Sequence, residues 1–187
     1  MTNRILLPYR QFIVTALPIF LIIYFVPAHA STPLHFLIDN FIETHLLGYA
    51  GFWTSHYPFS SKITTNYISI FGPGIAISVF YKTYPNINLT PLQMERIEKL
   101  GGIKYSLFSL CMIVIFYFIL TKHYLYPYEL ISQKNSLSVL GKHKILYSLY
   151  STLMLFGLYL MPVIFYIYFI LLPHKLFKRW KVKKPHQ

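Results

Sequence analysis

Long uncharged stretches alternate with clusters of charged residues along this chain. Four stretches contain no Asp, Glu, Lys, Arg or His: Phe12–Ala28, Ile63–Tyr81, Tyr105–Thr121 and Ile145–Pro173. As helices rising 1.5 Å per residue, the first three would be about 26–29 Å long, close to the roughly 30 Å hydrocarbon core of a bilayer. The pattern therefore predicts an all-α polytopic membrane protein with four transmembrane helices in a single membrane domain, residues 1–187.

Two of the four predicted spans are irregular. The second begins with the polar residues Thr64, Thr65 and Asn66, and it contains the sequence Gly72-Pro73-Gly74. Because a proline frees a backbone carbonyl that must find another partner in lipid, we expect a bent helix packed inside the bundle. The fourth span would be about 43 Å long, so we expect it to tilt, to bend at Pro162 or to extend beyond the hydrocarbon core.

An amphipathic helix is predicted before the second span, over Pro33–Trp53. Its apolar positions recur at helical spacing and are Leu34, Leu37, Ile38, Phe41, Ile42 and Leu46. His35, Asp39 and Glu43 lie four apart on the other face. Such a helix is expected to lie on the outer surface of the membrane, with this polar face in water. A metal site made of the three polar residues is the alternative, although no second set of ligands lies nearby.

Another short helix is predicted between the second and third spans, over Pro91–Leu100. Thr90 suits the N-cap position, Pro91 suits the first helical position, and Gln93 lies three residues after the cap. Gly101-Gly102 is expected to end this helix before the third span begins.

The basic residues predict the orientation of the spans, because Lys and Arg are enriched in cytoplasmic loops. The chain has 17 Lys and Arg against five Asp and Glu. With the N-terminus inside, twelve of the basic residues are cytoplasmic and five are outside. The reverse orientation would translocate the cluster between Lys175 and Lys184. Both ends are therefore predicted to be cytoplasmic, which makes the helix over 33–53 periplasmic and the helix over 91–100 cytoplasmic.

The basic C-terminal tail, residues 174–187, is expected to be held at the inner surface of the membrane. Lys175, Lys178, Arg179, Trp180 and Lys181 combine positive charge with an interfacial aromatic ring. A basic tail can also bind nucleic acid, but directly after a span the favoured interpretation is contact with membrane lipids. No nucleic-acid partner is predicted.

The N-terminal segment has a second interpretation. Two arginines, an apolar core and then Ala28-His29-Ala30 resemble a secretory signal peptide with its cleavage site. Cleavage would leave three spans without changing the rest of the topology. The apolar segment is long for a signal core and contains Pro18, which favours an uncleaved first span. Whether residues 12–30 are retained stays open.

Composition agrees with a membrane location and argues against several functions. Hydrophobic residues make up 55% of the chain and charged residues only 12%, about half the charge of a typical soluble domain. The predicted spans hold no Asp, Glu, Lys, Arg or His of the kind that transporters and proton pumps use. No G-x-S-x-G, H-E-x-x-H, Cys/His cluster or phosphate-binding loop is present, so no enzyme, metal or cofactor is predicted. Spans rich in Tyr, Phe and small residues instead favour binding to other membrane helices.

Two stretches carry a family resemblance. The first, at the start of the second span, consists of Ser55, Pro58, Lys62, Asn66, Tyr67 and Pro73. The second is the aromatic run Tyr166–Phe169, followed by Leu171-Leu172-Pro173 and the basic tail. Together with the four-span layout and the long first outer loop, they make the chain resemble the immunity proteins that protect bacteria from pore-forming colicins of the colicin A and B type.

The resemblance implies a protein of the bacterial inner (cytoplasmic) membrane that inhibits a toxin by binding it. Its partner would be the pore-forming domain of a colicin-like bacteriocin, whose inserted helices it would hold out of the open-channel state within the bilayer. The candidate toxin contacts are Lys62, Asn66 and Tyr67, with Tyr147 and Tyr150 of the fourth span. The alternatives are a small transport or channel component and an accessory subunit of a larger membrane complex.

Overall fold

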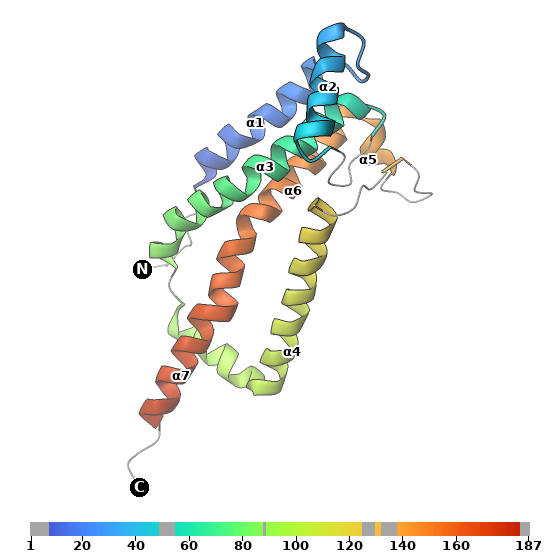
Figure 1. The fold of residues 1–187 in the computed structure, drawn as a ribbon. Coiled ribbons are helices and arrows are strands. Elements are labelled where there is room, and N and C mark those ends of the chain that lie inside the picture. Colours follow the sequence, from blue (N-terminus) through green and yellow to red (C-terminus); the bar gives the residue numbers. More distant parts are fainter. Residues whose placement is uncertain (1–7, 49–54, 88, 125–129, 132–137, 184–187) are drawn as a thin grey trace.

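The computed structural model describes residues 8–48, 55–87, 89–124, 130–131 and 138–183, and within these ranges the chain forms helices and no strand. Three long helices form a bundle: α1 (Tyr9–Phe25), α3 (Pro58–Thr83) and α6 (Lys144–Phe165). Figure 1 shows α1 running upward beside α3 and α6, which run downward. We call the end at which α1 finishes and α3 and α6 begin the upper end of the bundle.

The other helices lie at the ends of the bundle or beside it. Two short ones, α2 (Pro33–His45) and α5 (Ser138–Lys142), lie at the upper end (Figure 1). The long helix α4 (Pro91–Tyr124) follows α3 and a 3-10 turn, η1 (Tyr84–Asn86). At the lower end α6 continues through a π-helical segment, η2 (Tyr166–Leu171), into α7 (Leu172–Lys183).

The prediction of an all-α protein is confirmed for the described residues. Two helical segments are long and apolar enough to cross a membrane, Pro58–Asn86 and Lys144–Lys178. The apolar helices Tyr9–Phe25 and Ile103–Phe118 are shorter. Each of the four predicted uncharged stretches thus falls largely on a helix, and the helices of the second and fourth stretches are long enough to span a bilayer.

Two predicted boundaries are wrong. Gly101-Gly102 does not end a helix, because α4 continues from Pro91 to Tyr124 and Figure 1 shows a bend between its first turns and the rest. A glycine lowers helix propensity by about 1 kcal/mol but can adopt helical angles, and among the described glycines only Gly48 has a positive φ. The helix predicted over Pro33–Trp53 ends at His45, and residues 49–54 lie outside the described part of the chain.

The prolines do not break their helices. Pro73 lies inside α3, which is one continuous helix from Pro58 to Thr83 and packs against both α1 and α6. Pro162 lies inside α6, one turn before the π-helical segment η2. A proline removes a backbone hydrogen bond, and wide turns of this kind are one way in which a helix accommodates the loss.

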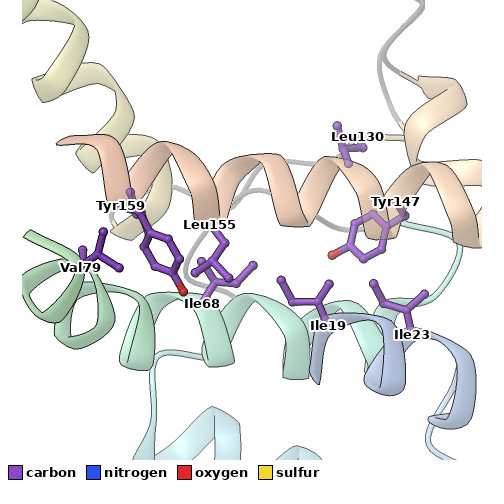
Figure 2. Close-up of a cluster of buried hydrophobic side chains, with 10 residues drawn as sticks. Ile19, Ile23, Ile68, Val79, Leu130, Tyr147, Leu155 and Tyr159 are labelled. Carbon is purple, nitrogen blue, oxygen red and sulfur yellow. The ribbon is translucent and has the colours of Figure 1, made fainter. Parts of the chain in front are cut away.

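The hydrophobic core lies where α1, α3 and α6 meet (Figure 2). Its buried members are Ile19, Ile23, Ile68, Ala76, Val79, Leu130, Tyr147, Leu155, Leu158 and Tyr159. Gly72 lets α3 approach α6 closely, since a Cβ atom at this position would lie 3.0 Å from Leu158 Cδ1. Gly74, on the same turn, has open space around it and faces away from the bundle.

The helix α4 stands apart from this bundle (Figure 1). It contacts the α6–η2 segment through rings, with Phe108 5.0 Å from Tyr168 and Phe116 6.3 Å from Phe165 between centroids. The Tyr105 hydroxyl also donates to the Tyr168 carbonyl. Much of the remaining α4 surface is apolar and exposed, including Leu107, Leu110 and Ile115.

Candidate functional site

The first turns of α3 are polar and yet buried. The buried polar side chains are Ser60, Ser61, Lys62, Thr64, Thr65, Asn66 and Ser69. Several bond back along the helix: Thr64 Oγ1 donates to the Ser60 carbonyl over 2.8 Å, and Thr65 Oγ1 donates to the Lys62 carbonyl over 3.1 Å. Such local bonds allow hydroxyl groups to lie inside a helical bundle without an unmet hydrogen bond.

Lys62 forms an ion pair with α2. Its Nζ lies 2.7 Å from Asp39 Oδ1 and 3.7 Å from Glu43 Oε2. The Lys62 side chain is only 1% exposed, against 31% for Asp39 and 56% for Glu43. A buried cation is costly unless a nearby anion compensates it, so these two carboxylates make the burial of Lys62 possible.

This ion pair corrects the sequence-based picture of α2. Asp39 and Glu43 were predicted to face water, but Asp39 faces α3, and Glu43 reaches the same cation while keeping more contact with solvent. The metal alternative is not supported, because no three His, Cys, Asp or Glu side chains converge among the described residues. The carboxylates face Lys62 because the attraction between opposite charges is stronger in a partly buried place than in water.

Asn66 joins α3 to the segment that follows α2. Its side-chain oxygen accepts from the Leu47 amide over 3.1 Å, and its Nδ2 donates to the Gly48 carbonyl over 2.7 Å. The same Nδ2 donates to the Lys62 carbonyl over 2.8 Å. Gly48 has φ 56°, a left-handed conformation that favours glycine, and this lets the chain turn directly against Asn66.

These contacts set the direction of α2. In chain order they join His35 to Phe59, Asp39 to Lys62, and Leu47 to Asn66. Because these contacts follow the same order along both segments, α2 runs in the same general direction as the first turns of α3, and Figure 1 shows it beside the upper part of that helix. The predicted helix therefore exists over Pro33–His45, and it packs against α3.

A second polar centre joins α1 to α3 and α6. The Tyr67 hydroxyl donates to the Thr15 carbonyl over 2.8 Å, and the Tyr159 hydroxyl donates to Thr15 Oγ1 over 2.6 Å. Thr15 Oγ1 in turn donates to the Gln11 carbonyl over 2.8 Å. Thr15 therefore uses both its backbone and its side chain to connect the three helices of the bundle.

Tyr147 differs from Tyr67 and Tyr159. It is fully buried among α1, α3 and α6 (Figure 2). Its hydroxyl approaches Ser61 and Ser151 without hydrogen-bond geometry to either. Tyr150, one turn further on, is half-buried and packs against the core. Tyr147 thus contributes mainly its ring to packing.

The segments before α3 and before α6 are also connected. The Ser55 and Ser61 hydroxyls lie 2.6 Å apart, and the His56 amide donates to the Gly141 carbonyl over 3.0 Å. The Tyr57 hydroxyl donates to the Lys142 carbonyl over 3.0 Å. These bonds hold α5 against the start of α3, so the upper end of the bundle is one assembled unit.

The structure brings the five candidate contact residues into this upper part, mostly as internal groups. Lys62, Asn66 and Tyr147 are 2%, 3% and 0% exposed, while Tyr67 and Tyr150 are half-buried. In the predicted tail, α7 carries a half-buried Lys175 and an exposed Lys178. The side chains of Arg179, Trp180 and Lys181 lie outside the described residues.

The sequence did not reveal that Asp39 and Glu43 pair with Lys62, or that Thr15 connects three helices. A signal for the two acids was present, since they are four residues apart on one helical face and share a predicted outer location with Lys62. Thr15 gave no such signal, because a single threonine in an apolar stretch is common.

In comparisons with known proteins, no family model, no curated protein and no solved structure matches the chain.

Proposed function

We propose that this chain is a four-span protein of the bacterial inner membrane, with both ends cytoplasmic, that confers immunity to a pore-forming colicin-like bacteriocin. In this proposal α1, α3, α4 and the α6–η2 segment are the spans, and the upper end of the bundle faces the periplasm. The protein binds the channel-forming helices of the toxin within the bilayer and prevents pore opening.

One observation carries the proposal: in the stretch that resembles the immunity family, polar side chains join α3 to several other segments. Lys62, Asn66 and Tyr67 each join α3 to another segment, and Ser55 contacts Ser61. Because the sequence predicts no catalytic or transport group, we assign this stretch the task of building a defined helical surface. The family resemblance supplies the identity of the partner, and the contacts explain why these residue types occur together.

A groove beside α4 supports a helix-binding task. It has a volume of about 590 Å³, lies between α4 and α6, and its walls include Phe80, Ile113, Phe116, Tyr117, Met161 and Phe165. Its lining is almost entirely apolar and aromatic, which suits an apolar helix and offers nothing to an ion or a polar solute. We assign this groove to an inserted helix of the toxin.

Survival of toxin-sensitive cells tests the proposal. Cells that express the chain would be exposed to a panel of pore-forming colicins while a dye reports their membrane potential. We expect at least one toxin of the panel to leave expressing cells polarised and viable at a dose that depolarises control cells. A nuclease toxin imported through the same receptor should kill both strains, because this protection acts on the pore.

Two equally exposed tyrosines provide a matched pair of variants. Tyr117 is 69% exposed and lines the groove, whereas Tyr81 is 70% exposed on α3 and does not. We expect Tyr117→Ala to lower protection and Tyr81→Ala to leave it intact.

Depolarisation across the whole panel would reject the immunity function. Solute flux in vesicles without any toxin, or co-purification with a constant membrane partner, would instead favour a transport component or an accessory subunit.

A further inference from the structure

The inward turn of the acidic residues determines what α2 presents to its surroundings. Leu34, Leu37 and Phe41 are 63%, 67% and 49% exposed, and their spacing places them on one stripe of the helix. Ile42, by contrast, is 4% exposed and lies one turn from Asp39, on the side of α2 that faces α3. We call Leu34, Leu37 and Phe41 the apolar stripe of α2.

The rest of the exposed surface of α2 is mainly polar. Asn40, Glu43 and Thr44 are exposed there, together with Phe36, which is 60% exposed. The exposed surface of α2 thus divides into the apolar stripe and a mainly polar flank. A helix with two such flanks fits a boundary between lipid and water, with one flank on each side. A helix surrounded only by water would be expected to expose polar residues on both flanks.

The position of α2 places the apolar stripe beside a predicted span. Because α2 runs in the same general direction as the first turns of α3, the stripe extends along the side of the bundle, and the chain after α2 reaches Asn66. Asn66 already belongs to the uncharged stretch Ile63–Tyr81 of α3. The stripe therefore lies next to the surface by which this helix would enter the bilayer.

Charge also fits a lipid environment. The apolar stripe carries no charged group, and the Asp39 carboxylate is compensated by Lys62 at 2.7 Å. An uncompensated carboxylate close to lipid would be strongly unfavourable, whereas a paired one is tolerated. The ion pair thus does two things: it neutralises the acidic face, and it fixes the rotation of α2 that turns the stripe outward.

We infer that the apolar stripe of α2 is a lipid-binding surface that inserts into the outer leaflet beside α3, and that Lys62 holds it in this orientation. The inference rests on the membrane location in the proposed function but not on toxin binding. Its partner is the bilayer itself, at the boundary between acyl chains and headgroups.

Spin labels on single cysteines in liposomes test this. In a Cys111→Ser background, labels would be placed by Leu37→Cys on the stripe, Asn40→Cys on the polar flank, and Leu153→Cys on α6 as a reference. Leu153 is 64% exposed on a helix that is long enough to span a membrane. Relaxation by oxygen, which concentrates in lipid, would be compared with relaxation by a water-soluble nickel chelate.

We expect the Leu37→Cys label to respond to oxygen and not to nickel, as the Leu153→Cys label does, and the Asn40→Cys label to respond to nickel. A nickel response at Leu37→Cys would overturn the inference, because the stripe would then face water. A weak response to both reagents would also overturn it, since a second protein surface would cover the stripe. A nickel response at Leu153→Cys would instead reject the membrane location on which the inference rests.

A charge variant tests the role of Lys62. Lys62→Met should give the Leu37→Cys label a nickel response, because α2 loses the partner that fixes its rotation. Lys99→Met is the control, since Lys99 pairs with Glu95 at 2.9 Å on the exposed surface of α4. If Lys62→Met fails to fold, Asp39→Asn removes the shorter ion-pair contact in a milder way. An unchanged Leu37→Cys label in the folded variant would reject the orienting role.

Discussion

The upper end of the bundle and the α4 side are held by different interactions. At the upper end an ion pair, an asparagine and several hydroxyl groups join α1, α2, α3 and α6. On the α4 side the contacts are mainly aromatic rings, and much of the apolar surface is exposed. In lipid, apolar side chains need no protein partner, whereas polar groups do. In the proposed membrane location, the comparison therefore predicts that polar contacts add to the core packing and strengthen the association of α1, α2, α3 and α6, whereas α4 depends mainly on ring contacts.

The largest effect is expected at Lys62, on the polar side of this comparison. Lys62→Met keeps an apolar stem of similar length but leaves Asp39 and Glu43 without their cation. Breaking a buried pair costs about 3 kcal/mol or more, and the partial exposure of both carboxylates favours the lower value. Unfolding in mixed detergent micelles, followed by circular dichroism, would measure the loss.

The matched control for that change is Lys99→Met. Its ion pair with Glu95 is exposed on both sides, so the loss should stay within about 0.5 kcal/mol. Equal losses for the two variants would contradict the assignment of the upper end as the part of the molecule that depends on polar contacts.

A smaller effect is expected from crowding the close approach of α3 to α6. Gly72→Leu would place new atoms against Leu158 and Leu155, and overpacking of this kind costs about 1–3 kcal/mol. Gly74→Leu is the control, because nothing lies within 4 Å of a Cβ atom at that position. The same unfolding measurement should separate the two variants, and a greater loss for Gly74→Leu would show that α3 is rotated differently against α6.

The two buried tyrosines of α6 give a still smaller difference. Tyr159→Phe removes the hydrogen bond to Thr15 and should cost about 1 kcal/mol. Tyr147→Phe removes a buried hydroxyl that lacks a partner, so the stability should stay the same or rise slightly. A loss at Tyr147→Phe equal to that at Tyr159→Phe would mean that the Tyr147 hydroxyl is bonded in the membrane, to Ser61, Ser151 or a bound water.

The positions of the helices could be predicted from the sequence because a long uncharged stretch has few stable alternatives to a helix in lipid. The predicted start of α4 at Pro91 is confirmed. It could be predicted because a helix start depends on local capping residues. The predicted stop at Gly101-Gly102 was wrong, because a glycine pair permits a helix end without requiring one.

The site could be predicted only in part. Periodicity identified the polar positions of α2, but it does not show which neighbour lies against them. Asp39 and Lys62 come from different segments, and their pairing depends on α2 running in the same general direction as the first turns of α3. The candidate residues Lys62, Asn66 and Tyr67 do lie close together, because they are neighbours on one helix. Their burial could not be foreseen, since it is produced by α1 and α2.

The smallest effect is expected on the α4 side, and it completes the comparison. Leu110 is 57% exposed on α4, and in the proposed four-span arrangement lipid chains would fill the space that Leu110→Ala leaves. The free energy of unfolding should therefore change by less than about 0.5 kcal/mol, as for a surface substitution in water. A loss of about 2 kcal/mol or more, typical of a truncated core leucine, would mean that another protein helix covers this face of α4. Association between helices would then determine stability on the α4 side as well as at the polar upper end.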